Sequence, residues 1–222
     1  MGEVKVIEIK KSIFNANEED AAALRKELKE KKIFLLNLMS SPGAGKTTTL
    51  VKLINNLKKD YRIAVMEADI DSDVDAVKIL NGTGVKAIQL HTGGMCHLDA
   101  EMTKQGLDNL PEDVDLIILE NVGNLVCPAE FDTGACKNMM ILSVPEGDDK
   151  PLKYPLMFQV CDIVAINKID CLPMFDFDMD KVKEYIHGRN AKAEIYPICA
   201  KNGKGIDELA DCLRREISEW RK

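Results

Sequence analysis

The sequence contains no apolar run that approaches the roughly 18 residues of a membrane span, and its first eleven residues lack the apolar core of a signal peptide. We therefore expect a cytoplasmic protein with no membrane partner. Positive charge is also scarce: 30 Lys and Arg against 37 Asp and Glu give a net charge of −7. An acidic chain of this kind is not expected to bind nucleic acid.

Paired cysteine motifs are absent as well. The seven cysteines form no C-x-x-C pair and no even-numbered framework, which argues against a disulfide scaffold and indicates mostly buried thiols in a reducing compartment. One or two of them remain available as metal ligands. Histidine is rare, so any histidine-dependent chemistry has to use His91, His97 or His187.

What the sequence does contain is a series of short apolar runs, enough for one α/β domain with a core. Their apolar residues are continuous rather than alternating, which is typical of parallel strands covered on both faces. The predicted strands are Ile33–Met39, Ile63–Ala68, Ala87–Leu90, Leu116–Leu119, Met139–Val144, Ile163–Ile166 and Ile195–Ile198.

Helical periodicity lies between these runs. Apolar residues recur at helical spacing over residues 50–57 and 206–220, and residues 17–32 form an amphipathic pattern. Alternating strands and helices predict a three-layer α/β fold with a mostly parallel central sheet flanked by helices. We expect a single domain over residues 33–222, with residues 1–32 as an N-terminal segment and a helix that packs on it.

The first predicted strand runs into Ser40-Ser41-Pro42-Gly43-Ala44-Gly45-Lys46-Thr47, which resembles the phosphate loop G-x-x-x-x-G-K-S/T of P-loop NTPases except that Ser40 replaces the first glycine. In such a loop backbone N–H groups surround the phosphates. Lys46 would reach the β- and γ-phosphates, and the Thr47 hydroxyl would bind Mg²⁺. The predicted phosphate-binding residues are Gly43, Ala44, Gly45, Lys46, Thr47 and Thr48.

The base specificity is predicted by Asn167-Lys168-Ile169-Asp170, which follows a predicted strand. In an N-K-x-D motif the carboxylate accepts hydrogen bonds from the N1–H and the exocyclic amine of guanine, whereas adenine would leave it badly paired. The fragment Cys199-Ala200-Lys201 resembles the S-A-K loop that backs the base. We therefore expect GTP and GDP as ligands, bound by Asn167, Lys168, Asp170, Ala200 and Lys201.

Two groups of acids are candidates for holding Mg²⁺. Glu120 begins Glu120-Asn121-Val122-Gly123, which resembles the D-x-x-G motif that senses the γ-phosphate. A second group stands at and after the end of the predicted strand at residues 63–68, and we favour Asp75 and then Asp69 within it. Its members are Glu67, Asp69, Asp71, Asp73 and Asp75. The predicted magnesium ligands are Thr47, Asp69, Asp75 and Glu120, and the predicted catalytic residues are Lys46, Asp75 and Glu120.

Soft metal donors stand close to this acid in the sequence. Cys127 follows Glu120 by seven residues, and Cys96 and His97 follow another predicted strand after two glycines. Thiolate and imidazole bind Zn²⁺ or Ni²⁺ and not Mg²⁺ or Ca²⁺. Three ligands leave a tetrahedron incomplete, so water or a second subunit would have to add the fourth. From residue chemistry alone, a metal site and an incidental group of thiols remain equally open.

Several longer strings resemble the HypB-type hydrogenase nickel-incorporation GTPases. They are residues 89–99 with Met95-Cys96-His97-Leu98, residues 120–128 around Cys127-Pro128, and residues 143–155 with Asp149-Lys150-Pro151-Leu152-Lys153-Tyr154. The resemblance implies a GTPase that dimerises with nucleotide and delivers nickel during maturation of nickel–iron hydrogenase. It also implies a small nickel- and zinc-binding partner, the hydrogenase large subunit as recipient, and Cys96, His97 and Cys127 as ligands.

Three other interpretations compete with this one. A urease-maturation GTPase would carry Cys-Pro-His, whereas Ala129 follows Cys127-Pro128 here. A regulatory GTP-binding module would show no metal dependence, and a non-enzymatic metal carrier would not need Lys46, Thr47 and Glu120. Hydrolysis is expected to be slow because no glutamine or arginine stands where it would orient water or neutralise charge. Lys150 or Lys153 could supply that charge across a dimer.

Overall fold

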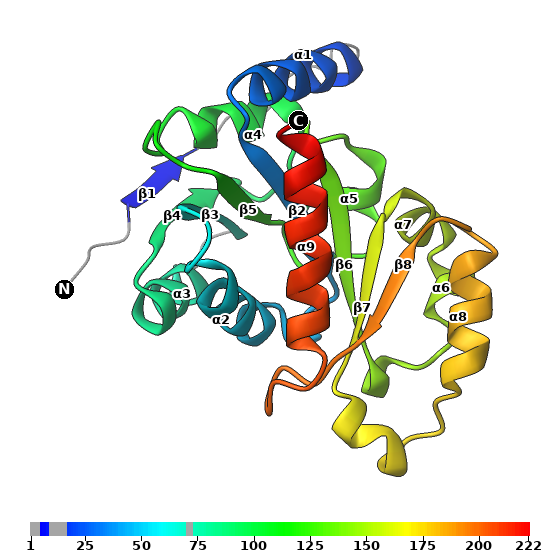
Figure 1. Cartoon of the computed structure of the whole chain (residues 1–222). Helices are drawn as coiled ribbons and strands as arrows, with labels where there is room; N and C mark the ends of the chain where they lie inside the picture. Colours follow the sequence, from blue (N-terminus) through cyan, green and yellow to red (C-terminus); the bar gives the residue numbers. More distant parts are fainter. Residues whose placement is uncertain (1–4, 9–16, 70–72) are drawn as a thin grey trace.

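The computed structural model describes residues 5–8, 17–69 and 73–222 of the chain. Over these ranges one eight-stranded sheet carries the strands in the order β1-β4-β3-β5-β2-β6-β7-β8, and every described pair of neighbours is parallel (Figure 1). The strands are β1 (Lys5–Glu8), β2 (Phe34–Ser40), β3 (Ile63–Asp69), β4 (Lys86–His91), β5 (Leu116–Glu120), β6 (Lys137–Ser143), β7 (Ile163–Asn167) and β8 (Glu194–Pro197).

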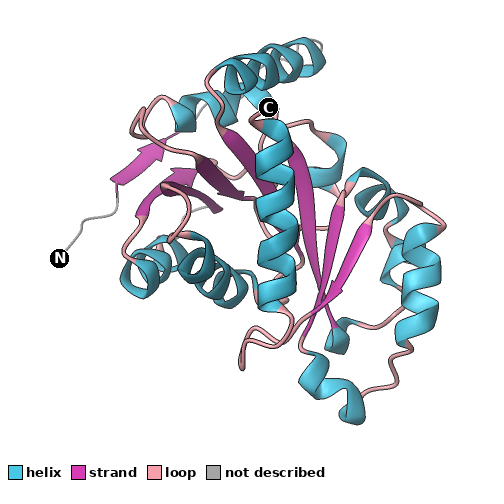
Figure 2. Ribbon diagram, viewed as in Figure 1, coloured by secondary structure: helices cyan, strands magenta, loops and turns pink. Residues whose placement is uncertain are grey.

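Helices connect the strands and cover both faces of the sheet (Figure 2). The longer ones are α1 (Asn17–Glu30), α2 (Lys46–Leu57), α3 (Val74–Thr83), α4 (Ala100–Leu107), α8 (Met179–His187) and α9 (Ile206–Trp220). The shorter ones are α5 (Cys127–Glu130), α6 (Lys150–Lys153), α7 (Pro155–Val160) and the 3₁₀ turns η2 (Val144–Glu146) and η3 (Ile169–Met174).

The core consists of apolar side chains on the two faces of the sheet. Helices α2, α3 and α9 pack on one face, and α1, α4, α7 and α8 pack on the other. The central strands β2 and β5 are buried along their whole length, which explains their continuous apolar sequences. The predicted three-layer α/β architecture is confirmed, and each predicted strand overlaps an observed one. The edge strand β1 was not predicted.

A row of three amides crosses the middle of this sheet. Asn121, directly after β5, donates from Nδ2 to Asn37 Oδ1 on β2 at 3.1 Å. Asn37 donates in turn to Asn138 Oδ1 on β6 at 2.9 Å, and Asn138 donates to the carbonyl of Val160 at 3.2 Å. At the other end the Val122 N–H donates to Asn121 Oδ1 at 2.9 Å. The segment that follows Glu120 is thereby anchored to the centre of the sheet.

Candidate functional site

The carboxyl ends of β2, β3, β5, β6 and β7 meet at one edge of the sheet, which is where parallel α/β folds bind ligands. The loop from β2 to α2 turns there with positive φ at Gly43 (77°) and Gly45 (97°). A Cβ on Gly45 would stand 2.5 Å from Asn167 Nδ2, so only glycine fits at this position. Ser40, in place of the motif's first glycine, is buried and donates its hydroxyl to the Ser41 carbonyl at 2.7 Å.

The predicted guanine motif holds this loop from the side. Asn167 Nδ2 donates to the Ala44 carbonyl at 2.9 Å, and Lys168 Nζ donates to the Gly43 carbonyl at 2.7 Å. Asn167 Oδ1 also accepts from the Ala200 N–H at 3.0 Å. The phosphate loop, the N-K-x-D segment and the Cys199–Lys201 segment therefore form one hydrogen-bonded unit.

A cavity of about 250 Å³ lies beside this unit, where the base of a nucleotide would be expected. The Cys199 thiol, in place of the serine of S-A-K, donates to Asp170 Oδ1 at 3.2 Å, which orients the carboxylate that would read guanine. The cavity is lined by Gly45, Thr48, Asn167, Lys168, Asp170, Cys171, Cys199, Ala200 and Lys201.

A larger cleft of about 450 Å³ follows on the other side of the loop. It brings together Lys46, Thr47 and Thr48 of α2 with acids of β3, α3 and β5. A Cβ added to Gly123 would stand 3.4 Å from Lys46 Nζ, so the segment after Glu120 approaches the phosphate-binding lysine closely. Among the predicted phosphate-loop residues only Ala44 is absent from the cleft wall, because it is buried behind the loop.

Three carboxylates converge in this cleft. Oxygens of Glu67, Asp75 and Glu120 lie within 4.8 Å of one another, the one such group of three potential ligands within the described ranges. Glu67 and Glu120 are register partners on β3 and β5. Asp69 lines the cleft but is not in the group, and Asp71 of the predicted acidic cluster lies outside the described residues. Glu67 belongs to the predicted acidic cluster but was not among the favoured ligands.

Burial disfavours the charged forms of Glu67 and Glu120. Burial raises the pKa of Glu67 to about 8, with the neighbouring Glu120 adding to the effect. Burial likewise raises the pKa of Glu120 to about 7, although Lys46 opposes the shift. The Oε2 atoms of both acids are buried without a hydrogen-bond partner among the described residues. An oxygen-lined group of this kind fits Mg²⁺, which would supply the missing positive charge.

The soft donors meet in a second place, formed by the loops after β4 and β5. Gly93 and Gly94 both take positive φ and turn the chain before Cys96. A hydrogen bond with the Cys127 thiol is the main cause that raises the pKa of Cys96, so the two thiols face each other. Cys96 Sγ lies 3.9 Å from His97 Nδ1. The structure thus brings together the donors that the sequence predicted.

The grouping of these donors is looser than that of the acids. The donor atoms of Cys96, His97 and Cys127 do not all lie within 4.8 Å of one another. Asn124 Nδ2 approaches Cys127 Sγ at 3.5 Å, and the His97 ring stacks on Phe131 with centroids 3.7 Å apart and an interplanar angle of 10°. Two thiols and an imidazole still fit Ni²⁺ or Zn²⁺ by donor chemistry.

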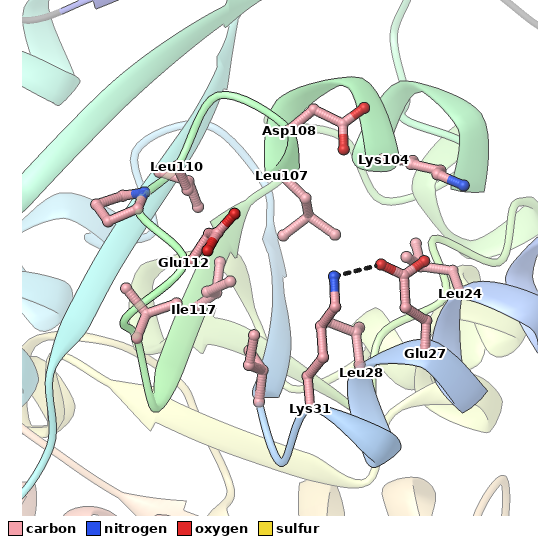
Figure 3. A pocket seen from close by; sticks show the side chains of 13 residues that line it. Leu24, Glu27, Leu28, Lys31, Lys104, Leu107, Asp108, Leu110, Glu112 and Ile117 are labelled. Atoms are coloured by element: carbon pink, nitrogen blue, oxygen red, sulfur yellow. Dashed lines mark hydrogen bonds and ion pairs between the residues drawn. The ribbon is translucent and has the colours of Figure 1, made fainter.

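Another cavity, of about 560 Å³ and larger than the two beside the phosphate loop, lies at the opposite end of the sheet (Figure 3). It opens between α1, α4 and the start of β5, with Leu28 and Ile117 in its wall and the ion pair of Glu27 and Lys31, 2.6 Å apart, at its rim. None of the predicted site residues lines it. Its size therefore does not identify the functional site.

The remaining predicted features are distributed as follows. Lys153 is exposed and pairs with Asp149, and Lys150 is half-buried with its Nζ 5.6 Å from the centre of the Tyr154 ring. Of the other five cysteines, 161, 199 and 212 are buried and 136 and 171 are half-buried. No helix in the described part of the chain is long and apolar enough to cross a membrane.

Comparison with known proteins relates this geometry to one group. The family model for the CobW/HypB/UreG nucleotide-binding domain matches residues 34–197. Hydrogenase maturation factor HypB of Azotobacter chroococcum mcd 1 is 42% identical over 217 residues, 97% of this chain and 71% of that protein. Hydrogenase/urease maturation factor HypB of Helicobacter pylori strain J99 is 40% identical over 220 residues, 97% of this chain and 90% of the relative.

A solved structure agrees with these relatives. The crystal structure of HypB from Helicobacter pylori in complex with nickel superimposes on this chain with a TM-score of 0.87 at 39% identity, covering 92% of this chain and 96% of that one. The crystal structure of HypB from Archaeoglobus fulgidus gives a TM-score of 0.83 at 35% identity, covering 90% and 98%.

Proposed function

Since this chain belongs to the HypB family within the CobW/HypB/UreG group, we propose that it is a GTP-hydrolysing metallochaperone that delivers nickel during hydrogenase maturation. One observation carries the proposal. Strand β5 presents Glu120 to the phosphate cleft, and seven residues later the same segment presents Cys127 to Cys96. A change at the γ-phosphate and a change at a bound metal ion would therefore act on one short stretch of backbone.

The nucleotide is proposed to bind with its base against Asp170 and its phosphates against α2. Support comes from the two cavities on either side of the phosphate loop and from the hydrogen bonds of Asn167 and Lys168 to that loop. Thr47, Asp75 and Glu120 are the proposed Mg²⁺ ligands, joined by Glu67 or Asp69. The cation would neutralise carboxylates that otherwise crowd one another.

Hydrolysis is proposed to be slow in the isolated chain. No arginine or glutamine lines the described cleft, and its second lysine, Lys78, is paired with Asp75 at 2.9 Å. Apart from Lys46, the cleft therefore lacks a group of the kind that orients the attacking water or neutralises charge on the transferred phosphoryl group. Lys46 is the proposed phosphate-binding cation, and Asp75 and Glu120 act through the metal. Faster turnover would require groups from a second subunit or from a partner.

A GTP-dependent homodimer is part of the same proposal. Met174 and Phe175, at the end of η3 and close in sequence to the base-reading Asp170, are exposed apolar side chains with 71% and 43% of their surface accessible. Exposed apolar side chains this close in sequence to a base-reading residue are suited to a contact that nucleotide binding regulates. The further proposed partners are a small nickel- and zinc-binding maturation protein and the hydrogenase large subunit.

Base recognition provides a test of the proposed guanine-nucleotide site. An Asp170→Asn variant exchanges a carboxylate acceptor for an amide, which mismatches guanine and matches xanthine, whose ring presents a carbonyl in place of the amine. We expect GDP affinity to fall by about 100-fold or more, with a gain in affinity for xanthosine diphosphate. Fluorescent-nucleotide titration measures both. Unchanged GDP affinity would remove the proposed base site, and Asp176→Asn serves as a surface control.

The proposed coupling between the nucleotide and the metal ion is tested by measuring nickel affinity in two nucleotide states. Nickel affinity measured with GDP and with a non-hydrolysable GTP analogue should differ, because the Glu120 and Cys127 ends of one segment are proposed to move together. Equal affinities in the two states would refute the coupling. The same titrations followed by sedimentation velocity would report whether the chain dimerises with the analogue.

A second candidate function is nickel delivery to urease. It is favoured by the relative from Helicobacter pylori, whose name covers both hydrogenase and urease maturation. The chemistry at Cys127 would be the same, and the recipient enzyme would differ. Complementation of strains lacking each maturation activity distinguishes the two outcomes.

A further inference from the structure

The two loops that carry the soft donors are joined by a residue from a distant part of the chain. Asn17, the first residue of α1, accepts at Oδ1 from the Ala100 N–H at 2.9 Å. Its Nδ2 donates to the Asp132 carbonyl at 3.0 Å. Ala100 follows His97 by three residues, and Asp132 follows Cys127 by five. One buried side chain therefore spans both ligand-bearing loops.

A second residue of the same helix grips one of these loops. Arg25 donates from Nη2 to both carboxylate oxygens of Asp132, at 2.7 and 2.8 Å, and from Nε to the Ala135 carbonyl at 2.9 Å. Asp132 Oδ1 also accepts from the Gly134 N–H at 2.9 Å. Because the Arg25 guanidinium contacts both oxygens of the Asp132 carboxylate, it fixes the orientation of that carboxylate as well as its distance from α1. Helix α1 thus holds the segment after Cys127 at two points.

The held segment continues directly into the metal donors. Phe131, next to Asp132, is the ring that stacks on His97. A displacement of the Asp132 backbone would therefore carry Phe131 with it and tilt or release the imidazole. On the other loop, the Ala100 N–H lies at the start of α4, where helical N–H groups have no partner within the helix. Asn17 supplies that partner, and Asp99 supplies one for Met102 at 2.8 Å.

We propose that Asn17 is a positioning residue for the Cys96, His97 and Cys127 site, and that it sets the separation of the two loops. This inference rests on the proposed metal-binding function. Metal–thiolate and metal–imidazole bonds are short, about 2.0–2.3 Å, so a shift of about 1 Å in either loop decides whether all three donors reach one ion. The donors do not all lie within 4.8 Å of one another, and the bridge determines how far each loop has to move to close.

The role differs from ordinary helix packing, which other α1 residues provide. Leu28 is buried against the sheet and lines the cavity at the opposite end of α1. Loss of its side chain should loosen α1 without breaking either hydrogen bond of Asn17. Two substitutions at Asn17 separate the functions of its two ends. Asn17→Ala removes both hydrogen bonds, whereas Asn17→Asp keeps the acceptor for Ala100 and loses the donor to Asp132.

The experiment measures Ni²⁺ and Zn²⁺ affinity by competition with a chromogenic chelator, on the whole chain and without nucleotide. We expect Asn17→Ala and Asn17→Asp to weaken binding by about tenfold or more, the size found when outer partners of metal ligands are removed. GDP affinity should stay unchanged. Leu28→Ala, the matched control, should lower Tm at least as much while leaving metal affinity at the wild-type value.

The thiolate-to-metal absorption of the Co²⁺-substituted chain reports the geometry of the metal site and does not depend on the stability of the fold. In the Asn17 variants its intensity or position should change at saturating metal. Wild-type affinity and spectrum in both Asn17 variants would overturn the inference, as would an equal loss of affinity in Leu28→Ala. If Asn17→Ala does not fold, Asn17→Asp alone decides. If Cys127→Ala binds metal as well as the wild-type chain does, the proposed metal site fails, and the inference fails with it.

Discussion

The phosphate cleft and the thiol site stand at the same edge of one sheet but are assembled in different ways. In the cleft, Asn167 and Lys168 hold the phosphate loop by direct hydrogen bonds, and three carboxylates already lie within 4.8 Å of one another. The donors of the thiol site come from two segments of the chain, which Asn17 joins by hydrogen bonds to Ala100 and Asp132. One site is preorganised for its ligand, and the other depends on the placement of its loops.

This difference has a functional meaning. A site that binds a cofactor tightly benefits from rigidity, because little order has to be imposed on binding. A site that must release its ion to a partner benefits from donors that a modest movement can separate. The comparison therefore predicts that substitutions in the two sites have separable effects, and that the sites communicate through the segment from Glu120 to Cys127.

The largest expected effect is on metal binding when a ligand is lost. Because partners of metal ligands alone are worth about 10–100-fold, Cys127→Ala should weaken Ni²⁺ and Zn²⁺ binding by more than about 100-fold. GDP affinity should remain within about twofold, since Cys127 does not line either nucleotide cavity. Chelator competition and fluorescent GDP titration measure the two quantities. Cys212→Ala, which removes a buried thiol of α9, is the control, and equal metal affinity in both variants would contradict the assignment.

The next effect tests the rigidity of the cleft. In Gly45→Ala the new methyl group meets the Asn167 amide at 2.5 Å in a left-handed backbone. Left-handed strain and the displaced hydrogen bonds together should cost roughly 3 kcal/mol, or about 100-fold in GDP affinity. Gly43→Ala meets no atom within 4 Å, so strain alone should cost about tenfold. Equal losses in the two variants would show that the contact with Asn167 is unimportant.

The smallest effect concerns the pH dependence of stability without metal or nucleotide. The pKa of Glu67 in the folded chain is about 8, above its ordinary value of 4.5, so folding favours its protonated form. This contribution is present below pH 4.5 and is lost as the pH rises toward 8. From about pH 6 to about pH 8 the loss should reach roughly 2 kcal/mol. Glu67→Gln, which stays neutral, should show a flatter dependence of urea midpoints, with a residual slope from Glu120.

If Glu67→Gln and the wild type show the same dependence on pH, the carboxylates are not crowded in the way the structure indicates. A second measurement adds Mg²⁺ at two pH values. Mg²⁺ should stabilise the wild type more at pH 8 than at pH 6, because the cation replaces the proton that Glu67 loses. The variant should respond less.

Much of the cleft could be predicted because its residues stand in contiguous motifs. The loop at residues 40–47 and the segment at 167–170 each carry their spacing within a few positions, and buried strands before them are easily recognised. Glu67 was named in the acidic cluster but not favoured, because its role depends on strand register: only the pairing of β3 with β5 sets it against Glu120. A single buried acid within an apolar run was the available signal.

The thiol site could be predicted only in part. The types of its donors are visible in the sequence, and the two glycines before Cys96 indicated a turn. The hydrogen bonds of Asn17 could not be predicted from the sequence, since its partners are 83 and 115 positions away. Strand β1 was missed for a related reason, because four residues at a sheet edge carry too short a pattern to distinguish a strand from a loop.

The row of amides through the sheet has a direction. Asn121 donates to Asn37, Asn37 donates to Asn138, and Asn138 donates to the Val160 carbonyl, while Asn121 accepts from the Val122 N–H. Reversing any one of them would set oxygen against oxygen or nitrogen against nitrogen at its neighbours, so the row is kept or lost as a whole. A slip of β2 by one residue would put Leu36 or Leu38 in the place of Asn37 and leave the amides of Asn121 and Asn138 without their partner. Three side chains thereby favour the native register of the central strands over registers shifted by one residue.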